Sequence, residues 1–178
     1  AGSGKSTAAR NLARALRVAY LDTGATYRAV TLKALREGID LADETQLADV
    51  ARRADIRLVP NGPALRVLLD GEDVSTDIRG SEVTEQSRYA AKFPAVRDVL
   101  VTLQRRIGAS LGDFVAEGRD QGTVVFPDAD LKFYFHADAE VRAARRVEDL
   151  RAAGEAPDPA AVLAAIVERD RRDAARDV

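Results

Sequence analysis

The sequence of 178 residues contains no cysteine, methionine or tryptophan and one histidine, His136. Without cysteine the chain cannot form disulfides, use a thiol nucleophile or hold a metal through sulfur. His136 has no nucleophile or metal-ligand pattern near it, so we interpret it as structural. Because cysteine-free chains fit a reducing compartment and no secretory leader precedes the first motif, we expect a cytoplasmic protein.

Long apolar runs are absent as well. The longest span only a few residues, whereas a membrane-spanning helix needs about 20, so we expect no membrane partner. The formal net charge of −2 lacks the basic surplus of general nucleic-acid binders, and we expect no nucleic-acid partner. Lysine is scarce, with 4 lysines against 23 arginines. This excess of arginine indicates either a biased genome composition or planar, bidentate binding of phosphate groups.

The chain begins in a glycine-rich segment that leads directly into an alanine-rich helix predicted over Ala8–Arg17. The segment matches the last part of the nucleotide-binding pattern G-x-x-x-x-G-K-[ST]. Its glycines let backbone N–H groups surround phosphate oxygens, while Lys5 would reach the β- and γ-phosphates of ATP and Ser6 would ligate Mg²⁺. A plain connector ahead of a helix is the alternative. The predicted phosphate loop consists of Gly2, Ser3, Gly4, Lys5, Ser6 and Thr7.

A second polar cluster follows the short apolar strand predicted over Val18–Leu21. Asp22 and Thr23 lie at the carboxyl end of that strand, where parallel α/β sheets place their ligands. Tyr27 and Arg28 fall in the first turn of the next predicted helix. There Arg28 could clamp a phosphate, and Tyr27 could line a base or sugar. The alternative is a capped helix that carries a surface arginine.

A third cluster, Glu-Gly-Arg-Asp-Gln-Gly-Thr over residues 117–123, follows a strand predicted over Asp113–Ala116. Polar side chains and glycines at this place favour a binding loop. Asp120 is suited to accept a hydrogen bond from an exocyclic amine such as N4 of cytosine, and Arg119 is a second phosphate clamp. The alternative is a solvent-exposed turn.

Two groups of charged residues lie on helices predicted near the end of the sequence. Arg169, Asp173 and Arg176 are spaced i, i+4 and i+7. They therefore share one helix face, which is either a binding face or a surface ion-pair ladder. The second group consists of Arg142, Arg145 and Arg146. It is either a solvated helix face or part of a lid that neutralises the phosphates of ATP as it closes.

Strands and helices alternate at both ends of the chain, which is typical of a parallel α/β sheet. Between them, strands over Ile56–Val59 and Leu65–Leu69 and the turn Asp70-Gly71 predict a small antiparallel sheet. We therefore predict an α/β fold of the P-loop type with a small antiparallel insert. The predicted domains are a core of residues 1–38 and 108–178, with a lid at about 140–158, and an insert of residues 39–107.

The remaining elements follow from periodicity. Apolar residues at helical spacing predict a helix through Val96, Leu100, Leu103 and Ile107. A further apolar strand is predicted over Leu131–Phe135, and helices are predicted over Glu140–Ala153 and Pro159–Arg176.

Taken together, these segments resemble the bacterial cytidylate kinases, a family of P-loop kinases for nucleoside monophosphates. The likeness covers nearly the whole chain, and EGRDQGTVVFPDAD at residues 117–130 is its most specific part. The segments that show it are Gly2–Thr7, Leu21–Arg28, Glu117–Asp130 and Glu168–Arg176, with Asp70–Ser75 and Ile78-Arg79 beside the predicted hairpin. The resemblance implies that the insert of residues 39–107 binds the monophosphate.

The resemblance implies a role for each matching side chain. Arg28, Arg119 and Arg169 would hold the acceptor's phosphate, and with Lys5 they would be the catalytic residues.

It also implies how the rest of the acceptor is bound. The pyrimidine would face Arg97 and Asp120, with the hydroxyl of Thr23 nearby. Asp173 would meet the sugar hydroxyls, and Arg176 would lie close to the same ligand.

The fold that the resemblance implies is a five-stranded parallel sheet whose central strand precedes the P-loop. That strand, the first glycine of the motif and the final strand and helix have no counterpart in the 178 residues. We therefore expect a piece of a longer gene product. A missing central strand would leave backbone hydrogen bonds and apolar faces unsatisfied, so we expect this piece by itself to be unstable or inactive.

The implied reaction transfers the γ-phosphate of ATP to CMP or dCMP, giving CDP or dCDP and ADP, in a monomeric enzyme of pyrimidine nucleotide metabolism. The alternatives are a P-loop kinase for UMP or AMP and a nucleotide-binding switch without phosphotransfer. Asp120 favours cytosine, because uracil has a carbonyl where cytosine has an amine. An arginine-lined second site favours a kinase, because a simple switch has no phosphorylated acceptor.

Overall fold

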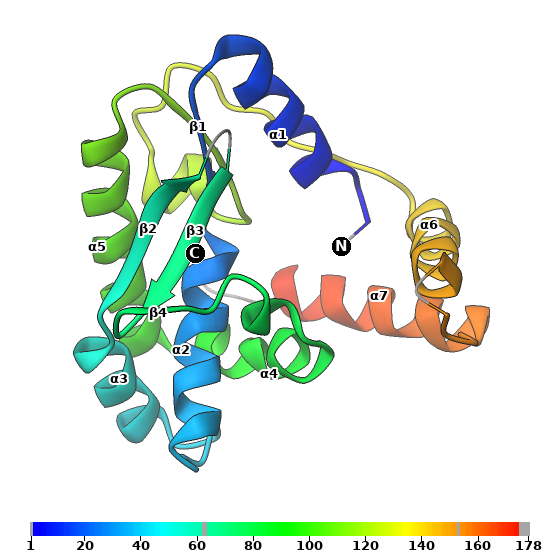
Figure 1. The fold of residues 1–178 in the computed structure, drawn as a ribbon. Coiled ribbons are helices and arrows are strands. Elements are labelled where there is room, and N and C mark those ends of the chain that lie inside the picture. Colours follow the sequence, from blue (N-terminus) through cyan, green and yellow to red (C-terminus); the bar gives the residue numbers. More distant parts are fainter. Residues whose placement is uncertain (1, 62–63, 153, 175–178) are drawn as a thin grey trace. The chain divides into compact units, whose positions relative to one another are not determined.

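The computed structural model describes residues 2–61, 64–152 and 154–174. They belong to two compact units, one within residues 1–8 and 130–178 and the other within residues 9–129. Figure 1 shows the helices α1 (Lys5–Leu16), α2 (Gly24–Arg36), α3 (Glu44–Arg53), α4 (Ser81–Lys92), α5 (Pro94–Leu111), α6 (Ala139–Ala152) and α7 (Pro159–Ala174), and the strands β1 (Ala19–Asp22), β2 (Ile56–Asn61), β3 (Ala64–Leu69), β4 (Glu72–Asp73) and β5 (Phe114–Glu117).

The larger unit, residues 9–129, contains the parallel pair of strands β1 and β5. The two strands are in register, with Asp22 opposite Glu117 at their carboxyl ends. Leu21 in the middle of the pair is fully buried, so the strands are fixed by side-chain packing as well as by backbone hydrogen bonds. The predicted α/β fold with a parallel sheet and a small antiparallel sheet is confirmed.

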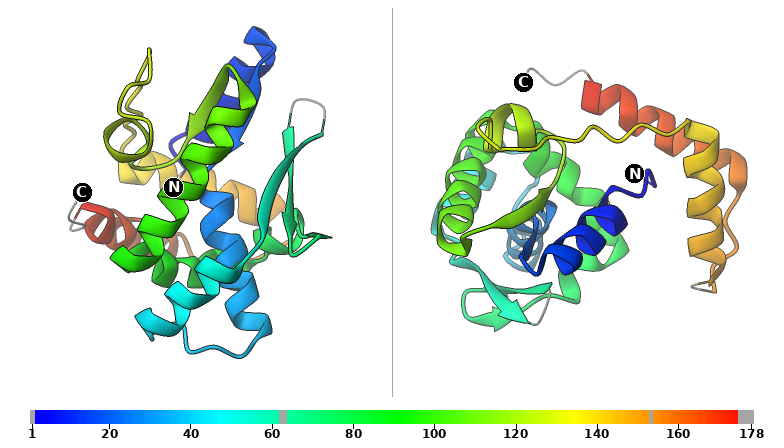
Figure 2. Two further views of the ribbon diagram at one scale, coloured as in Figure 1. Left: turned by 90° about the vertical axis from the view of Figure 1, so that its left-hand side faces the viewer. Right: turned by 90° about the horizontal axis from the view of Figure 1, so that it is seen from above.

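The core of the larger unit lies where α2, α3, α4 and α5 pack together and against the β2–β3 hairpin. Of the four residues predicted on α5 from helical spacing, Val96, Leu100 and Ile107 are buried and Leu103 is half-buried. Both views in Figure 2 show α5 beside β5, and α5 also contacts η2 (Gln121–Val125), a π-helical turn that follows the strand. The longest helix of the unit therefore supports the segment that carries the third polar cluster.

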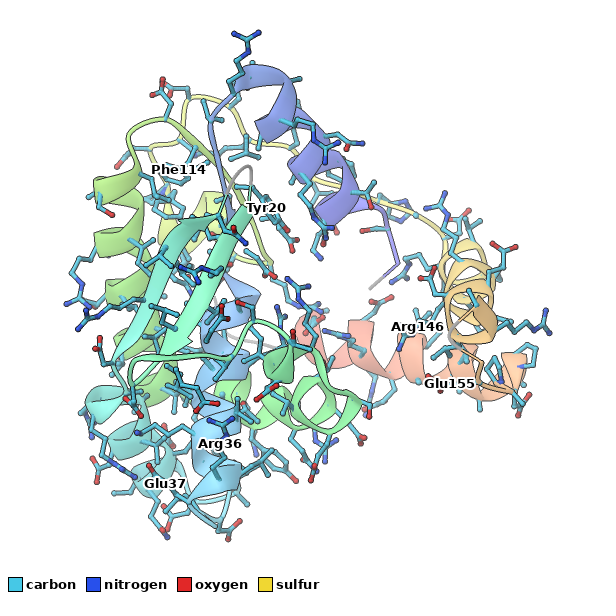
Figure 3. The ribbon with its side chains drawn as sticks, viewed as in Figure 1. Tyr20, Arg36, Glu37, Phe114, Arg146 and Glu155 are labelled. Atoms are coloured by element: carbon cyan, nitrogen blue, oxygen red, sulfur yellow. The ribbon has the colours of Figure 1, made fainter. Side chains whose placement is uncertain are left out.

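The antiparallel sheet β2–β3–β4 confirms the predicted hairpin. Asp70 and Gly71 have φ angles of 50° and 90°, and two successive positive φ angles form the type I′ turn that Asp-Gly sequences favour. Arg36, near the end of α2 in Figure 3, donates to Glu72 at 2.7 Å and to Asp77 at 2.9 Å. These exposed ion pairs connect β4 and the segment after it to α2.

Two helices, α3 and α4, are absent from the sequence prediction. The first of them has a capping signal, because Asp43 accepts hydrogen bonds from the amide of Gln46 at 3.0 Å and from its side chain at 2.7 Å. These bonds hold the pKa of the Asp43 carboxyl below its usual value. Acid-x-x-Gln is a recognised helix start, so this pair is the signal that identifies α3.

The predicted strand over Leu131–Phe135 is wrong. These residues form an extended segment without strand pairing, and Leu131, Phe133 and Tyr134 are 76%, 70% and 93% exposed. A strand requires a neighbour that supplies hydrogen-bond partners. Among the residues that the structure describes, the parallel sheet has only β1 and β5, and neither pairs with residues 131–135. Residue types that favour strands are therefore not sufficient to make this segment a strand.

The smaller unit contains α6 and α7, which agree with the predicted helices over the residues described. They pack through Ala143, Val147 and Ile166, each 6% exposed. Within the described part of the chain, none of the helices combines the length and the apolar content needed to cross a bilayer. The predicted division into a core, a lid and an insert stays a prediction.

Candidate active site

The predicted phosphate loop lies in the smaller unit, and its last three residues, 5–7, form the start of α1. Gly2 and Gly4 have φ angles of 77° and 85°, a region that residues with a Cβ rarely adopt. α1 starts directly after Gly4, at Lys5, and the backbone amide of Ala8 donates to the Gly4 carbonyl at 2.9 Å. The first amides of a helix are not used by the helix itself and attract anions. The loop and this helix start therefore have the geometry of a phosphate site.

Two arginines of α6 contact this loop in different ways. A Cβ on Gly2 would lie 3.0 Å from the carbonyl oxygen of Arg142, so only glycine allows α6 to approach so closely. The Arg145 guanidinium donates to the Gly2 carbonyl at 3.3 Å. Arg146, which Figure 3 labels on α6, is exposed, and so is Arg145. The structure thus places Arg145 at the loop and leaves Arg146 in solvent.

Arg142 belongs to the packing of the smaller unit. The residue is 9% exposed, and its guanidinium donates to both carboxylate oxygens of Asp170 and to the Ala137 carbonyl. The hydrogen bonds to Asp170 raise the pKa of the guanidinium above its usual value. The predicted group of three arginines therefore divides into one buried cross-link between α6 and α7 and two exposed cations.

In the larger unit, Asp22 and Arg28 form an ion pair at the carboxyl end of β1. The Arg28 Nη2 atom lies 2.8 Å from Asp22 Oδ2, and the side chains are 19% and 18% exposed. A Cβ on Gly24 would lie 3.0 Å from Arg28 Nη1 and 3.2 Å from Asp22 Oδ1, so this glycine leaves room for the pair. Arg28 Nε is buried without a hydrogen-bond partner among the residues described. The ion pair with Asp22 thus leaves one N–H of the guanidinium, at Nε, without a partner among the described residues.

Hydrogen bonds join the ends of β1 and β5. The Thr23 hydroxyl donates to the Glu117 carbonyl at 2.9 Å, and the Tyr20 hydroxyl donates to Glu117 Oε1 at 3.3 Å. Burial raises the pKa of the Tyr20 phenol above its usual value, and the nearby carboxylates of Glu117 and Asp22 raise it further. Tyr20 therefore stays protonated and keeps donating to the carboxylate beside it.

The third polar cluster begins with Gly118 and continues into η2. A Cβ on Gly118 would lie 2.4 Å from Gln121 Nε2 and 2.5 Å from Thr23 Oγ1, so glycine is required where this chain segment passes over Thr23. Arg97 on α5 donates to Asp120 Oδ2 at 3.2 Å, and each side chain is 16% exposed. The structure therefore brings together the two residues assigned to the pyrimidine.

In the larger unit, Asp22, Thr23 and Arg28 lie close together around the turn from β1 to α2. Arg97 on α5 contacts Asp120. Tyr27 is half-buried on α2, and Arg119 is exposed beside Asp120. The other predicted residues belong to the smaller unit: the phosphate loop, Arg145, Arg146, the exposed Arg169 and the half-buried Asp173. Arg176 lies outside the described residues.

Two residues of α5 in this region were not predicted. Gln104 is fully buried and bonds to the β1–α2 turn. Arg105 donates to the carbonyls of Val124 and Val125 at 2.6 Å and 3.0 Å, at the end of η2. Gln104 follows Arg97 by two helical turns, and this spacing on one helix face is the sequence signal that could have identified it.

Comparison with known proteins gives a consistent result. The family model described as cytidylate kinase matches residues 1–178. The chain is 49% identical to the cytidylate kinase of Rhodococcus opacus over 177 residues, which cover 99% of this chain and 77% of that protein. It is 49% identical to the cytidylate kinases of Pelotomaculum thermopropionicum over 177 residues (99% and 78%) and of Mycobacterium avium over 180 residues (100% and 78%).

Proposed function

Because the chain belongs to the cytidylate kinase family, we propose that it transfers the γ-phosphate of ATP to CMP or dCMP. An oxygen of the acceptor's phosphate forms a bond to the γ-phosphorus, and the bond from that phosphorus to the β–γ bridging oxygen breaks. The products are ADP and CDP or dCDP. The match over residues 1–178 is the observation that carries this proposal, and the two sets of phosphate-binding groups support it.

The donor is assigned to the phosphate loop. The backbone amides at the start of α1 would hold the phosphates of ATP, and Lys5 would reach the β- and γ-phosphates. Arg145, which contacts the Gly2 carbonyl, would add positive charge at this site, together with Arg146. Charge that develops on the transferred group is stabilised by donors that are already in place.

Mg²⁺ fits the donor set of this chain as a partner of ATP. Among the residues described, no group of three or more histidine, cysteine or acidic side chains could hold a metal ion. The Ser6 hydroxyl in the first turn of α1 is a hard oxygen ligand, and Mg²⁺ commonly completes its coordination with phosphate oxygens and water. Ser6 would hold the ion, which supplies charge neutralisation on the phosphates.

The acceptor's phosphate is assigned to Arg28, with Arg119 and Arg169 as further donors. Arg28 is oriented by Asp22 and has a buried Nε atom that the described residues leave unsatisfied. Since the attacking oxygen belongs to an anionic phosphate, the reaction needs no general base. The arginines then act by positioning and by charge neutralisation. Asp173 and Arg176 are assigned to the sugar.

The base is assigned to Asp120 and Arg97, with the Thr23 hydroxyl nearby. The Asp120 carboxylate only accepts hydrogen bonds, and N4 of cytosine is a donor. Arg97 occupies Oδ2 of this carboxylate at 3.2 Å. The other oxygen would receive the N4 amine, whereas the O4 carbonyl of uracil would meet a carboxylate and be repelled.

The proposal is tested by measuring ADP release from ATP and Mg²⁺ by the gene product in the presence of CMP, dCMP, UMP, AMP or GMP. We expect turnover that depends on CMP and dCMP and is lost when Mg²⁺ is removed. Turnover with UMP or AMP instead would reassign the acceptor. Slow hydrolysis that no monophosphate stimulates would favour a nucleotide-binding switch.

Substituting Asp120→Asn tests base selection. The amide can donate to O4 of uracil, so we expect the KM for CMP to rise about tenfold or more while the KM for UMP falls, since one base contact contributes about 1–3 kcal/mol. Steady-state kinetics with each monophosphate at saturating ATP measure both values. Asp113→Asn, an exposed residue before β5, is the matched control and should change neither. Equal changes for CMP and UMP would remove Asp120 from base recognition.

A further inference from the structure

Gln104, in the middle of α5, is a polar residue that none of the roles above uses. Its side chain is fully buried. Its Nε2 atom donates to the Thr26 hydroxyl at 2.8 Å and, over a longer 3.4 Å, to the Thr23 carbonyl. Both acceptors belong to the turn from β1 into α2 and to the first turn of that helix.

The orientation of the Gln104 amide follows from its neighbours. The Thr26 hydroxyl donates its hydrogen to the Thr23 carbonyl at 2.8 Å, so its oxygen can only accept from Gln104. The Thr23 carbonyl is an acceptor as well. The amide nitrogen must therefore face the turn, and Oε1 points away from it, buried without a partner among the described residues.

A buried, unsatisfied oxygen is unfavourable for folding. Leucine of similar size would fill the same space without that loss. The favourable contribution of Gln104 therefore lies in the bonds that its nitrogen donates to the turn. The turn is held on its other side too, because the Thr23 hydroxyl donates to the Glu117 carbonyl at 2.9 Å.

The turn that Gln104 holds is the one that aims Arg28. Thr26 lies in the first turn of α2, and Arg28, which begins the second turn, reaches back to Asp22 at 2.8 Å. Arg97, seven positions before Gln104 on the same helix, donates to Asp120 at 3.2 Å. One helix thus contacts both the segment assigned to the acceptor's phosphate and the residue assigned to its base.

We propose that Gln104 is a positioning residue that sets where α2 begins, and that α5 thereby fixes the spacing between Arg28 and Asp120. The proposal rests on the proposed function. It assigns Gln104 no contact with the acceptor: the residue acts through Thr23 and Thr26. Its loss would disturb binding of the monophosphate and leave the ATP loop, which belongs to the other compact unit, unaffected.

The first test is Gln104→Leu, which keeps the volume and removes the donors. We expect the KM for CMP to rise about tenfold, with the KM for ATP unchanged. Hydrogen exchange of the amides in the first turn of α2 should become faster, while exchange in α3 stays as in the unsubstituted protein. Substitution of Thr31→Val is the matched control. It removes another buried hydroxyl of α2, which donates to the Tyr27 carbonyl at 2.9 Å, and should leave both KM values unchanged.

The second test is Gln104→Glu, which replaces a donor by a titratable group. An ionised carboxylate can only accept and would face two acceptors, whereas the protonated acid can donate to Thr26. Burial raises the pKa of a carboxyl group. The quantity to follow is the ratio of the KM for CMP in the Gln104→Glu variant to the KM for CMP in the unsubstituted protein. We expect this ratio to be near one at low pH and to increase as the pH rises from about 5.5 to 8.5.

The outcomes separate the positioning role from the proposed function. Unchanged KM values and unchanged hydrogen exchange in Gln104→Leu would overturn the positioning role while the kinase activity stands. Equal increases in the KM for CMP and ATP would overturn it too, because they indicate general disruption. Should the unsubstituted protein fail to phosphorylate CMP or dCMP, the proposed function fails. Faster exchange confined to the first turn of α2 then supports the role of Gln104 in placing that turn, and unchanged exchange overturns it.

Discussion

Replacing Arg28 by methionine is expected to lower kcat/KM for CMP by about 10²–10³-fold, the loss seen when one donor to a developing charge is removed. Arg28 is held by Asp22 at 2.8 Å and retains a buried Nε atom without a partner in the described part of the chain. Methionine keeps the unbranched aliphatic stem and removes every donor. Steady-state kinetics with CMP varied at saturating ATP measure the loss.

The matched control for this experiment is Arg36→Met. Arg36 lies two turns further along α2 and pairs with Glu72 and Asp77. The substitution removes the same charge from the same helix, and we expect kcat/KM for CMP to change less than twofold, because exposed ion pairs contribute little. Equal losses in the two variants would show that α2 needs its charge in general and that Arg28 does not bind the acceptor.

Replacing Lys5 by methionine is expected to lower kcat by about 10²–10³-fold with either CMP or dCMP as acceptor. Lys5 begins α1 directly after a loop in which Gly2 and Gly4 have positive φ angles. Its ammonium group would neutralise the β- and γ-phosphates as the transferred group leaves. Single-turnover measurements at saturating ATP separate the chemical step from binding.

Arg14→Met controls for the loss of a cation from α1, since Arg14 is exposed in the last turn of that helix. We expect it to leave kcat unchanged. A Lys5→Met variant with normal kcat and a raised KM for ATP would contradict a role in the transition state and restrict Lys5 to binding ATP.

Features encoded by neighbouring residues were accessible from the sequence. The Asp70-Gly71 turn and the loop before Lys5 depend on positive φ angles, which a few residue types adopt readily. The buried face of α5 follows from helical spacing. The segment 131–135 shows the limit of such local signals, because its apolar and aromatic residues are typical of a strand but the described residues give it no strand to pair with.

The sequence did not show which charged residues are buried in ion pairs and which are exposed. Arg142 and Arg145 differ little as residues of one predicted helix, yet Arg142 is buried against Asp170 and Arg145 is exposed beside Gly2. Arg97 pairs with Asp120, which is 23 positions away. Helical spacing does not predict such pairs, because they depend on how separate helices, strands and loops pack.

The sequence by itself therefore determined the family, and it predicted a phosphate loop and the types of residue that could bind a phosphorylated pyrimidine, since these depend on short motifs. Only the tertiary structure decided that Asp22 orients Arg28 and that Gln104 donates hydrogen bonds to the turn between β1 and α2. The physical reason is that a buried polar group needs a partner within hydrogen-bond distance. Which partner it finds is set by the packing of α2, α5 and the β1–β5 pair.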